Sequence, residues 1–447
     1  MSFKSNYKKL EEFICVLLII FSGFVMVAIF KINNFWTFAS LDEMLWHMRS
    51  RIFWDKMLEF DFSGLIQSAQ PGITVYWFTG FMMKFINFDF NDVLVRIANK
   101  EAEGLDFNAV TNANDMAIYQ AYENISFAFN VPLFLLLAAF FISFYYLLKK
   151  LGFNRIVASF SLLFLTTSIY LHYWVTPSDK MLNIFMTLSF LAILVHLAKN
   201  TDKKYLIMSA IFGAWAVLSK LSALFILPFY FLIFIYYKWP LDKEKIKLII
   251  KNYFIWILVF VFVSIIFLPS IITDPGEVYN LVFNSNAVFE QNYSAKSYAS
   301  RVVFDYARLF SFAVVGYMTQ VSVLSLIFYF FLKSRKKYKN VFNGFPKKHI
   351  NAVGAYIILF IVMVTLVSGN HDTRFMSPAF VMLNVFSAMG VFGVVEVLAK
   401  KSGVENKFKT IFYAAIFLLA ILSQALFITS SGLLAKKIIE LDMIKFF

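Results

Sequence analysis

The sequence predicts an all-α polytopic membrane protein with about eleven transmembrane helices and a large extracytoplasmic first loop. Three observations predict this fold class. The 447 residues are 60% hydrophobic and their mean hydropathy is +0.71, which is typical of polytopic membrane proteins and excludes a soluble globule. Apolar runs of spanning length follow one another along the chain. The connectors rich in Lys and Arg alternate with connectors that are not.

The apolar runs set the number of spans. The first run covers residues 13–30, and we interpret it as a retained span because its apolar core is long for a signal peptide and no small-residue cleavage site follows. Further runs begin near residues 125, 156, 181, 205, 221, 253, 309, 350, 375 and 410. Residues 205–237 are too long for one span and are interrupted at Ser219-Lys220, which predicts a short hairpin.

The distribution of charge decides which side each connector faces. Residues 73–88 are apolar but short, and counting them as a span would invert every later connector. If they form an interfacial helix in the outer loop, the N-terminus and the alternate connectors hold 25 of the 41 Lys and Arg and only 7 of the 27 acids. The positive-inside rule then places these segments in the cytoplasm. The basic connectors are residues 149–155, 199–204, 238–251, 333–348 and 396–409.

This topology accounts for the net charge of +14 as membrane anchoring. We therefore expect membrane lipids but no nucleic acid as partners, and a multi-pass protein of the plasma or inner membrane. Residues 1–447 form one domain, in which residues 33–124 are the extracytoplasmic catalytic loop and residues 269–302 a second large outer loop. The single cysteine, Cys15, excludes disulfides and cysteine metal sites within the chain.

The first outer loop carries an amphipathic helix that opens with two adjacent acids, Asp42 and Glu43. Leu41, Leu45, Met48 and Ile52 recur along one side of it, and Asp42, Trp46, Arg49 and Phe53 along another. Ser40 and Glu43 have the spacing of a capping box, and acids in a first turn suit the helix dipole. Capping is therefore the plain interpretation of these acids, and catalysis is the alternative.

Polar residues gather at the outer ends of the predicted spans, whose middles carry no charge. A proton- or ion-coupled transporter would usually need such a charge, so the arrangement favours an enzyme that works at the outer membrane surface. The four clusters are Asp42-Glu43 with Trp46, His47 and Arg49; residues 172–180, HYWVTPSDK; Lys220; and residues 371–374, HDTR.

Each of the later clusters also has a plain interpretation. Asp179 follows Pro177-Ser178 at the start of a helix and can act as a cap. Lys220 can extend its ammonium group to the lipid headgroups. Arg374, with His371 beside it, lies at the outer mouth of the tenth span, where its guanidinium contacts a lipid phosphate or holds a substrate phosphate bidentately.

The order of these features resembles the C-type membrane glycosyltransferases of the protein mannosyltransferase class, glycosyltransferase family 39, and is similar in plan to the lipid A aminoarabinose transferases. The resemblance covers about residues 13–393. It rests on a first span, the outer Asp-Glu with its Trp and Arg, Pro71-Gly72 before a short apolar helix, the second outer Asp in HYWVTPSDKMLNIFMTLSF, LSKLSALFILP, and a late DTRFMSP. Gln70 and Phe375 stand where many relatives have His and Tyr, and the Trp-Trp-Asp signature of oligosaccharyltransferases is absent.

The resemblance implies a sugar donor linked to polyprenyl phosphate and an acceptor hydroxyl, on a glycan, lipid or protein of the cell envelope, at the extracytoplasmic face. Asp42 matches the first-loop acid that serves as base or metal-site ligand, Glu43 its neighbour, and Asp179 the second-loop acid. Arg374 matches the arginine of a late helix mouth. A divalent metal ion shared by Asp42 and Asp179 is one option, and no other cofactor is expected.

The residues suit this chemistry. A carboxylate such as Asp42 can act as the general base for an acceptor hydroxyl. Fixed cations, namely Arg374, Lys220 and Arg49, would stabilise the charge that grows on the departing phosphate. The rival hypothesis is a non-enzymatic flippase or transporter of lipid-linked glycans, which predicts a polar pathway through the bilayer. The spans contain only scattered Ser, Thr and Asn, so the sequence favours the enzyme.

Overall fold

The computed structural model describes residues 3–34, 41–62, 65, 72–85, 113–168, 177–199, 202–280, 319–367, 377–402 and 406–440. Within these ranges every regular element is a helix. A helix occupies the described part of each of the eleven predicted apolar runs, whereas residues 309–318, where the eighth run begins, lie outside the described residues. These helices are α1 (Phe3–Asn34), α5 (Ala113–Lys150), α6 (Arg155–Thr166), α7 (Pro177–Lys199), α8 (Lys203–Ser219), η4 (Leu221–Phe225) with α9 (Ile226–Lys238), α10 (Lys243–Phe267), α14 (Gln320–Ser334), α15 (Lys347–Val367), α16 (Ser377–Ser402) and α17 (Asn406–Glu440). The predicted fold class is confirmed.

The helices differ in how far they could cross a bilayer. Six in the described part are long and apolar enough to span it, or seven if the short helix η8 (Lys336–Phe342) and α15 are counted as one bent span. By contrast, α6 has 12 residues, which at about 1.5 Å per residue is roughly six-tenths of the hydrocarbon thickness. The apolar pattern located α6 correctly but did not show how short it is.

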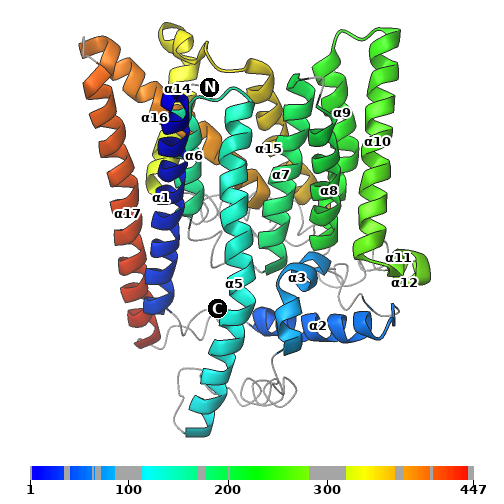
Figure 1. Ribbon diagram of the computed structural model, residues 1–447. Coiled ribbons are helices and arrows are strands. Elements are labelled where there is room, and N and C mark those ends of the chain that lie inside the picture. The colour runs from blue at the N-terminus through cyan, green and yellow to red at the C-terminus, as the bar shows by residue number, and fades with distance from the viewer. Residues whose placement is uncertain are drawn as a thin grey trace, which may run out of the picture.

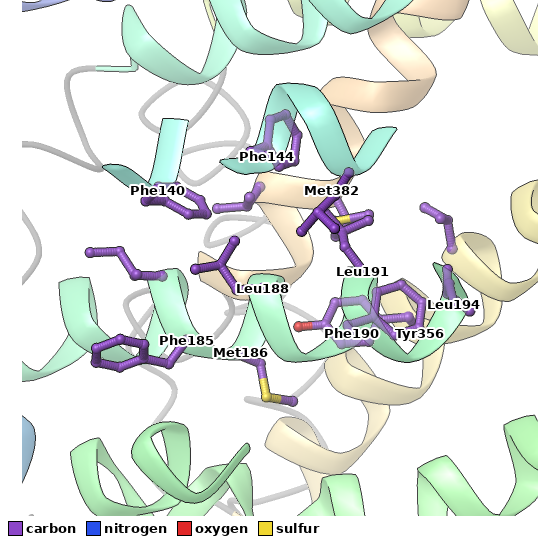
Figure 2. Close-up of a cluster of buried hydrophobic side chains, with 14 of the residues drawn as sticks. Phe140, Phe144, Phe185, Met186, Leu188, Phe190, Leu191, Leu194, Tyr356 and Met382 are labelled. Carbon is purple, nitrogen blue, oxygen red and sulfur yellow. The ribbon is translucent and has the colours of Figure 1, made fainter. Parts of the chain in front are cut away.

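The core of the bundle is built around α7. Its spanning segment is 94% buried, as expected for a helix that is apolar on all sides. Figure 2 shows Phe140 and Phe144 of α5, Tyr356 of α15 and Met382 of α16 gathered about its side chains. The ring of Tyr356 stacks on Phe190 of α7 at 4.3 Å. At the periphery, α10 and α17 bury only 28% and 11% of their spanning segments, so their remaining surface faces lipid.

A buried polar network joins α7, α8, α9 and α10. Ser189 Oγ donates to the carbonyl of Ser209 at 2.7 Å, Tyr230 donates its hydroxyl to Ser189 Oγ at 2.9 Å, and Trp256 Nε1 donates to Ser209 Oγ at 3.1 Å. Because lipid offers no hydrogen bonds, such groups must be satisfied within the protein. The network therefore holds four helices in one register without leaving a charge in the bilayer.

The polar insert lies across one end of this bundle. In Figure 1, α2 (Leu41–Leu58) runs across the lower end, with α3 (Ile73–Phe78) between it and the spans, and α11 (Ser270–Thr273) and α12 (Pro275–Tyr279) lie at the same end. Residues 73–85 form α3 and the short η2 (Gly80–Phe85), so they do not span. Trp77 Nε1 donates to the carbonyl of Phe267 at 2.9 Å, which fixes the insert to the end of α10.

The basic connectors gather at the opposite end. The connectors that follow α5, α7, α9, α14 and α16 all lie along the upper edge of Figure 1, where α1 also begins, whereas α17 ends at the lower edge. The structure thus separates the basic connectors from the insert, as the charge distribution predicts. Which of the two ends faces the cytoplasm stays a prediction.

Candidate functional site

The candidate site lies where α7 begins and α8 ends, and it centres on a buried ion pair. Asp179 occupies the first turn of α7, and Lys220 follows the last residue of α8 in an extended conformation. Lys220 Nζ donates to Asp179 Oδ1 at 2.5 Å, with side chains 6% and 1% exposed. Removing two charges from water carries a large desolvation cost that the pair only partly recovers, so the pair is not explained by stability alone.

The local sequence accounts for this geometry. Pro177 occupies the first position of α7, where its missing N–H costs nothing and its fixed φ angle favours a helix start. The extended backbone at Lys220 separates α8 from η4, which confirms the predicted interruption at Ser219-Lys220. The snorkelling interpretation of Lys220 is wrong, because a buried ammonium paired with Asp179 does not reach the headgroups. The pairing itself joins positions 41 residues apart, and no local pattern signals it.

The insert docks on the residue that precedes Lys220. The backbone N–H of Gly72 donates to the carbonyl of Ser219 at 3.3 Å. The hydroxyls of Thr74 and Ser219 form a hydrogen bond of 2.6 Å, in which either atom can be the donor. All these contacts are buried. The start of α3 is therefore fixed to the residue that precedes Lys220. A displacement of the insert would displace Ser219 and change the position of Lys220.

The acid-bearing helix α2 meets α3 through a tryptophan. Trp46 is 3% exposed and Phe53 is fully buried, whereas Ile52 is 38% exposed. A Cβ atom on Gly72, whose φ is +57°, would lie 1.8 Å from the Trp46 ring, so only glycine fits there. Trp46 and Phe53 are thus both buried, and they lie on the side of α2 that also carries Asp42 and Arg49. This is the side that docks on the protein. The side chains of Asp42, Glu43 and His47 lie outside the described residues.

Arg49 and Tyr76 form a second polar group beside Trp46. The guanidinium of Arg49 lies 5.6 Å from the centre of the Trp46 ring, a cation–π contact. Tyr76 of α3 is fully buried, and its hydroxyl has no hydrogen-bond partner in the described part of the chain. Burial raises the pKa of Tyr76, and the charge of Arg49 opposes that rise. Sequence reasoning missed Tyr76, although its position soon after Pro71-Gly72 was a signal.

The remaining predicted residues and the metal ion are not placed. His371 and Arg374 lie outside the described residues. Ser377, which begins α16 three residues after Arg374 in the sequence, donates to Asn183 Oδ1 at 2.6 Å, and Asn183 lies one helical turn beyond Asp179. No group of three or more His, Cys, Asp or Glu side chains suited to a metal ion occurs in the described residues. Lys220 already occupies one carboxylate oxygen of Asp179, so the shared metal ion stays a prediction.

An apolar cavity of about 220 Å³ lies between the α8–η4 hairpin and α10, and its lining includes neither Asp179 nor Lys220. Leu218 and Leu221, the residues that flank Ser219 and Lys220, line one wall, and α10 lines the opposite wall. The full lining is Val217, Leu218, Leu221, Leu224, Phe260, Val261, Ser264, Ile265, Leu268, Ile271 and Val278. The site therefore joins a buried charged pair, an arginine and a phenol to a space suited to hydrocarbon.

No protein-family model matches this chain, and no curated protein sequence does. Among solved structures, the chain is similar to the archaeal oligosaccharyltransferase AglB from Archaeoglobus fulgidus, at 13% identity, over 95% of this chain and 56% of that one, with a TM-score of 0.50. It is also similar to ArnT from Cupriavidus metallidurans, at 11% identity, over 93% of this chain and 75% of that one, with a TM-score of 0.49. This chain spans little more than half the length of AglB. It is a multi-pass membrane protein with the fold of the C-type membrane glycosyltransferases.

Proposed function

We propose that this protein is a membrane glycosyltransferase that moves a sugar from a polyprenyl-phosphate donor to an acceptor hydroxyl on the extracytoplasmic face. The observation that carries the proposal is the buried Asp179–Lys220 pair, whose lysine follows the residue that the insert contacts and is flanked in sequence by Leu218 and Leu221, which line an apolar cavity. A polyprenyl-phosphate donor presents the same combination of charge and hydrocarbon. The structure of AglB to which the chain is similar contains a dolichol-phosphate, which supports a donor of this class.

Each group has a role in the proposed reaction. The cavity between the α8–η4 hairpin and α10 takes an isoprenoid segment of the donor. Lys220, Arg49, Arg374 and His371 stabilise the phosphate as its negative charge grows, since fixed cations in a site that excludes water act more strongly than in bulk solvent. Asp179 holds the ammonium group of Lys220 in place, so it contributes by positioning.

The reaction proceeds by one displacement. Asp42, with Glu43 beside it, takes the proton of the acceptor hydroxyl, and the oxygen attacks the anomeric carbon. The bond between that carbon and the phosphate oxygen breaks, and polyprenyl phosphate leaves with the electron pair. A single displacement inverts the configuration of the sugar. A divalent metal ion at Asp42 and Asp179 would add a Lewis acid at the phosphate.

The direct test is transfer of radiolabel from polyprenyl-phosphate sugars in membranes that contain the full chain, followed by identification of the labelled product. We expect labelling that is lost in Asp179→Asn and kept in Lys56→Gln, which removes one partner of the half-exposed Lys56–Asp61 pair on the insert. Absence of transfer from every lipid-linked sugar, together with movement of those lipids between leaflets by the same protein, would establish the flippase instead.

A further inference from the structure

The strongest unassigned feature is the connector between α14 and α15, at the end of the bundle opposite the candidate site (Figure 1). Residues 333–348 contain seven Lys and Arg and no Asp or Glu. Six of these cations have described side chains and all six are exposed: Lys333, Arg335, Lys336, Lys337, Lys347 and Lys348. We call residues 333–348 the basic connector.

Among the described residues, the basic connector differs from the other connectors at this end in having no acidic partner. Each of the others has an ion pair, and these are Lys149–Glu12, Lys204–Asp202, Lys245–Asp242 and Lys409–Glu396, at 2.9 to 3.1 Å. None of the six described cations of the basic connector forms one within the described chain. They contact aromatic rings and one carbonyl instead, such as Lys333 near Tyr329 at 5.4 Å and Lys348 Nζ to the carbonyl of Tyr237 at 3.3 Å.

The geometry of the connector matches a membrane interface. The axes of η8 and α15 differ by 102°, so η8 lies across the direction in which α15 crosses the bilayer. Phe342 and Phe345 are 9% and 6% exposed and turn into the protein, where Phe342 packs at 5.3 Å from Tyr329 and Phe345 at 5.2 Å from Phe392. One side of the segment is therefore anchored to α14 and α16, and its exposed cations lie at the end of these two helices.

The segment is packed closely against the bundle. A Cβ atom on Gly393 of α16 would lie 2.8 Å from the Phe342 ring. At the other end of the segment, His349 is hydrogen-bonded to the hydroxyl of Tyr237 in α9. The segment is thus attached to α9, α14 and α16, and a ligand bound by its cations would stabilise all three helices through it.

We propose that the basic connector is a binding site for the headgroups of anionic phospholipids in the leaflet that surrounds it. The six exposed cations have no acidic partner in the part of the chain that the structure describes, they lie at the ends of membrane helices, and a polybasic segment in that position attracts anionic lipid phosphates. An acidic soluble protein would need to approach a surface that the bilayer already flanks, so the geometry favours the lipid. The inference is independent of the proposed transfer reaction.

The test uses the full chain in nanodiscs of equimolar phosphatidylcholine and phosphatidylglycerol. The readout is the selectivity of the protein for spin-labelled phosphatidylglycerol over spin-labelled phosphatidylcholine. The variant Arg335→Gln/Lys336→Gln/Lys337→Gln should lower this selectivity roughly fivefold or more, since one basic residue near the surface contributes on the order of 1 kcal/mol, which is about a fivefold change. High salt should reduce the selectivity of the unmodified protein and leave the variant little changed.

The matched control is Lys243→Gln/Lys247→Gln/Lys251→Gln. It removes an equal number of positive charges from α10, at the same end of the protein. Because Asp242 and Glu244 lie next to these lysines in the sequence, the control should change the selectivity less than the connector variant does. Melting temperatures in phosphatidylcholine alone show whether each variant folds. Equal losses in the two variants, or no loss in the connector variant, would overturn the proposal. Binding of polyglutamate to the detergent-solubilised protein, with no lipid selectivity, would overturn it in favour of an acidic protein partner.

Discussion

At the scale of single residues, Asp179 and Lys220 are energetically dependent on each other. Both side chains are almost fully buried, so removing one leaves the other as an uncompensated charge in a medium of low dielectric constant. Replacing both by neutral groups of similar volume removes that penalty together with the interaction. Stability and activity should therefore respond differently to single and double changes, which separates a structural role from a functional one.

We expect Asp179→Asn or Lys220→Met alone to destabilise the protein by roughly 3–5 kcal/mol, because each leaves a buried charge unpaired. The double variant Asp179→Asn/Lys220→Met should recover most of the melting temperature in detergent and still transfer no sugar. Lys56→Met, at the half-exposed pair with Asp61, should cost about 1 kcal/mol or less. A double variant with normal transfer would leave the pair a purely structural role.

A second residue-scale prediction separates cap from catalyst at Asp42. As a first-turn or capping acid, Asp42 should tolerate Asn, which keeps its shape and caps well, at a cost on the order of 1 kcal/mol or less. As a general base, Asp42 cannot be replaced by Asn, because an amide does not accept a proton at neutral pH. Turnover should then fall by roughly 10²–10⁴-fold. The transfer rate and the melting temperature of Asp42→Asn decide between the two. Ordinary transfer by the folded variant would move the base to Glu43 or Asp179.

Sequence reasoning selected Asp179 and Lys220 separately but did not predict their contact. Selection was possible because each is a charged residue at the end of an apolar run, which a sequence shows directly. The contact depends on how the start of α7 meets the end of α8, whereas the sequence suggested only a lipid headgroup or a substrate phosphate as the partner of Lys220. The same limit applies to Ser219, whose bonds to Gly72 and Thr74 cross about 145 positions. Tertiary packing determines which distant residues meet, and the local hydrophobic periodicity of the sequence contains no information about such contacts.

At the scale of elements, the insert is a module that joins the bundle through a few close contacts. The apolar pattern predicted the α2 helix but left open which side of it is buried. The structure buries the aromatic side, at Trp46 and Phe53, and leaves Ile52 of the aliphatic side exposed. Aromatic side chains bury more area per residue and favour edge-to-face contacts, and Trp54 and Trp77 meet in this way at 4.8 Å.

The substitution Gly72→Ala should undock this module. Gly72 has a positive φ, and an added Cβ would lie 1.8 Å from the Trp46 ring, so α2 must move away from α3. We expect transfer activity to fall at least tenfold in line with the sensitivity of catalysis to ~1 Å displacements, faster proteolysis within the insert, and little change in the helix content of the bundle. Gly344→Ala is the control, because nothing lies within 4 Å of its added Cβ. Unchanged activity and proteolysis in Gly72→Ala would show that the insert tolerates the displacement.

At the scale of the whole molecule, the sequence predicted the membrane architecture well because hydrocarbon imposes strict rules. Every spanning segment must be a long apolar helix, so the eleven runs could be located without knowledge of their contacts. The segregation of Lys and Arg could be predicted as well, since topology depends on it. The lengths of α5 and α6 could not be predicted in this way. The residue at which each of these helices begins or ends depends on contacts with the insert and with neighbouring helices, and not on the thickness of the bilayer.

The final prediction concerns which end of the molecule faces the cytoplasm. The insert and the basic connectors lie at opposite ends of the bundle (Figure 1), and the positive-inside rule assigns the basic end to the cytoplasm. Single cysteines introduced in a Cys15→Ser background report the side directly. Glu59→Cys on the insert, together with Asn91→Cys and Asn108→Cys in the same predicted outer loop, should react with a membrane-impermeant maleimide in intact cells.

The opposite end supplies the matched probe. Asn343→Cys, an exposed position within the basic connector, should react only after the cells are permeabilised. Both probes share one protein and one reagent, so a difference between them reports sidedness and not reactivity. Labelling of Asn343→Cys in intact cells, with Glu59→Cys protected until permeabilisation, would place the candidate site in the cytoplasm. It would then exclude an acceptor on the extracytoplasmic face, because Asp179 and Lys220 lie at the same end as the insert.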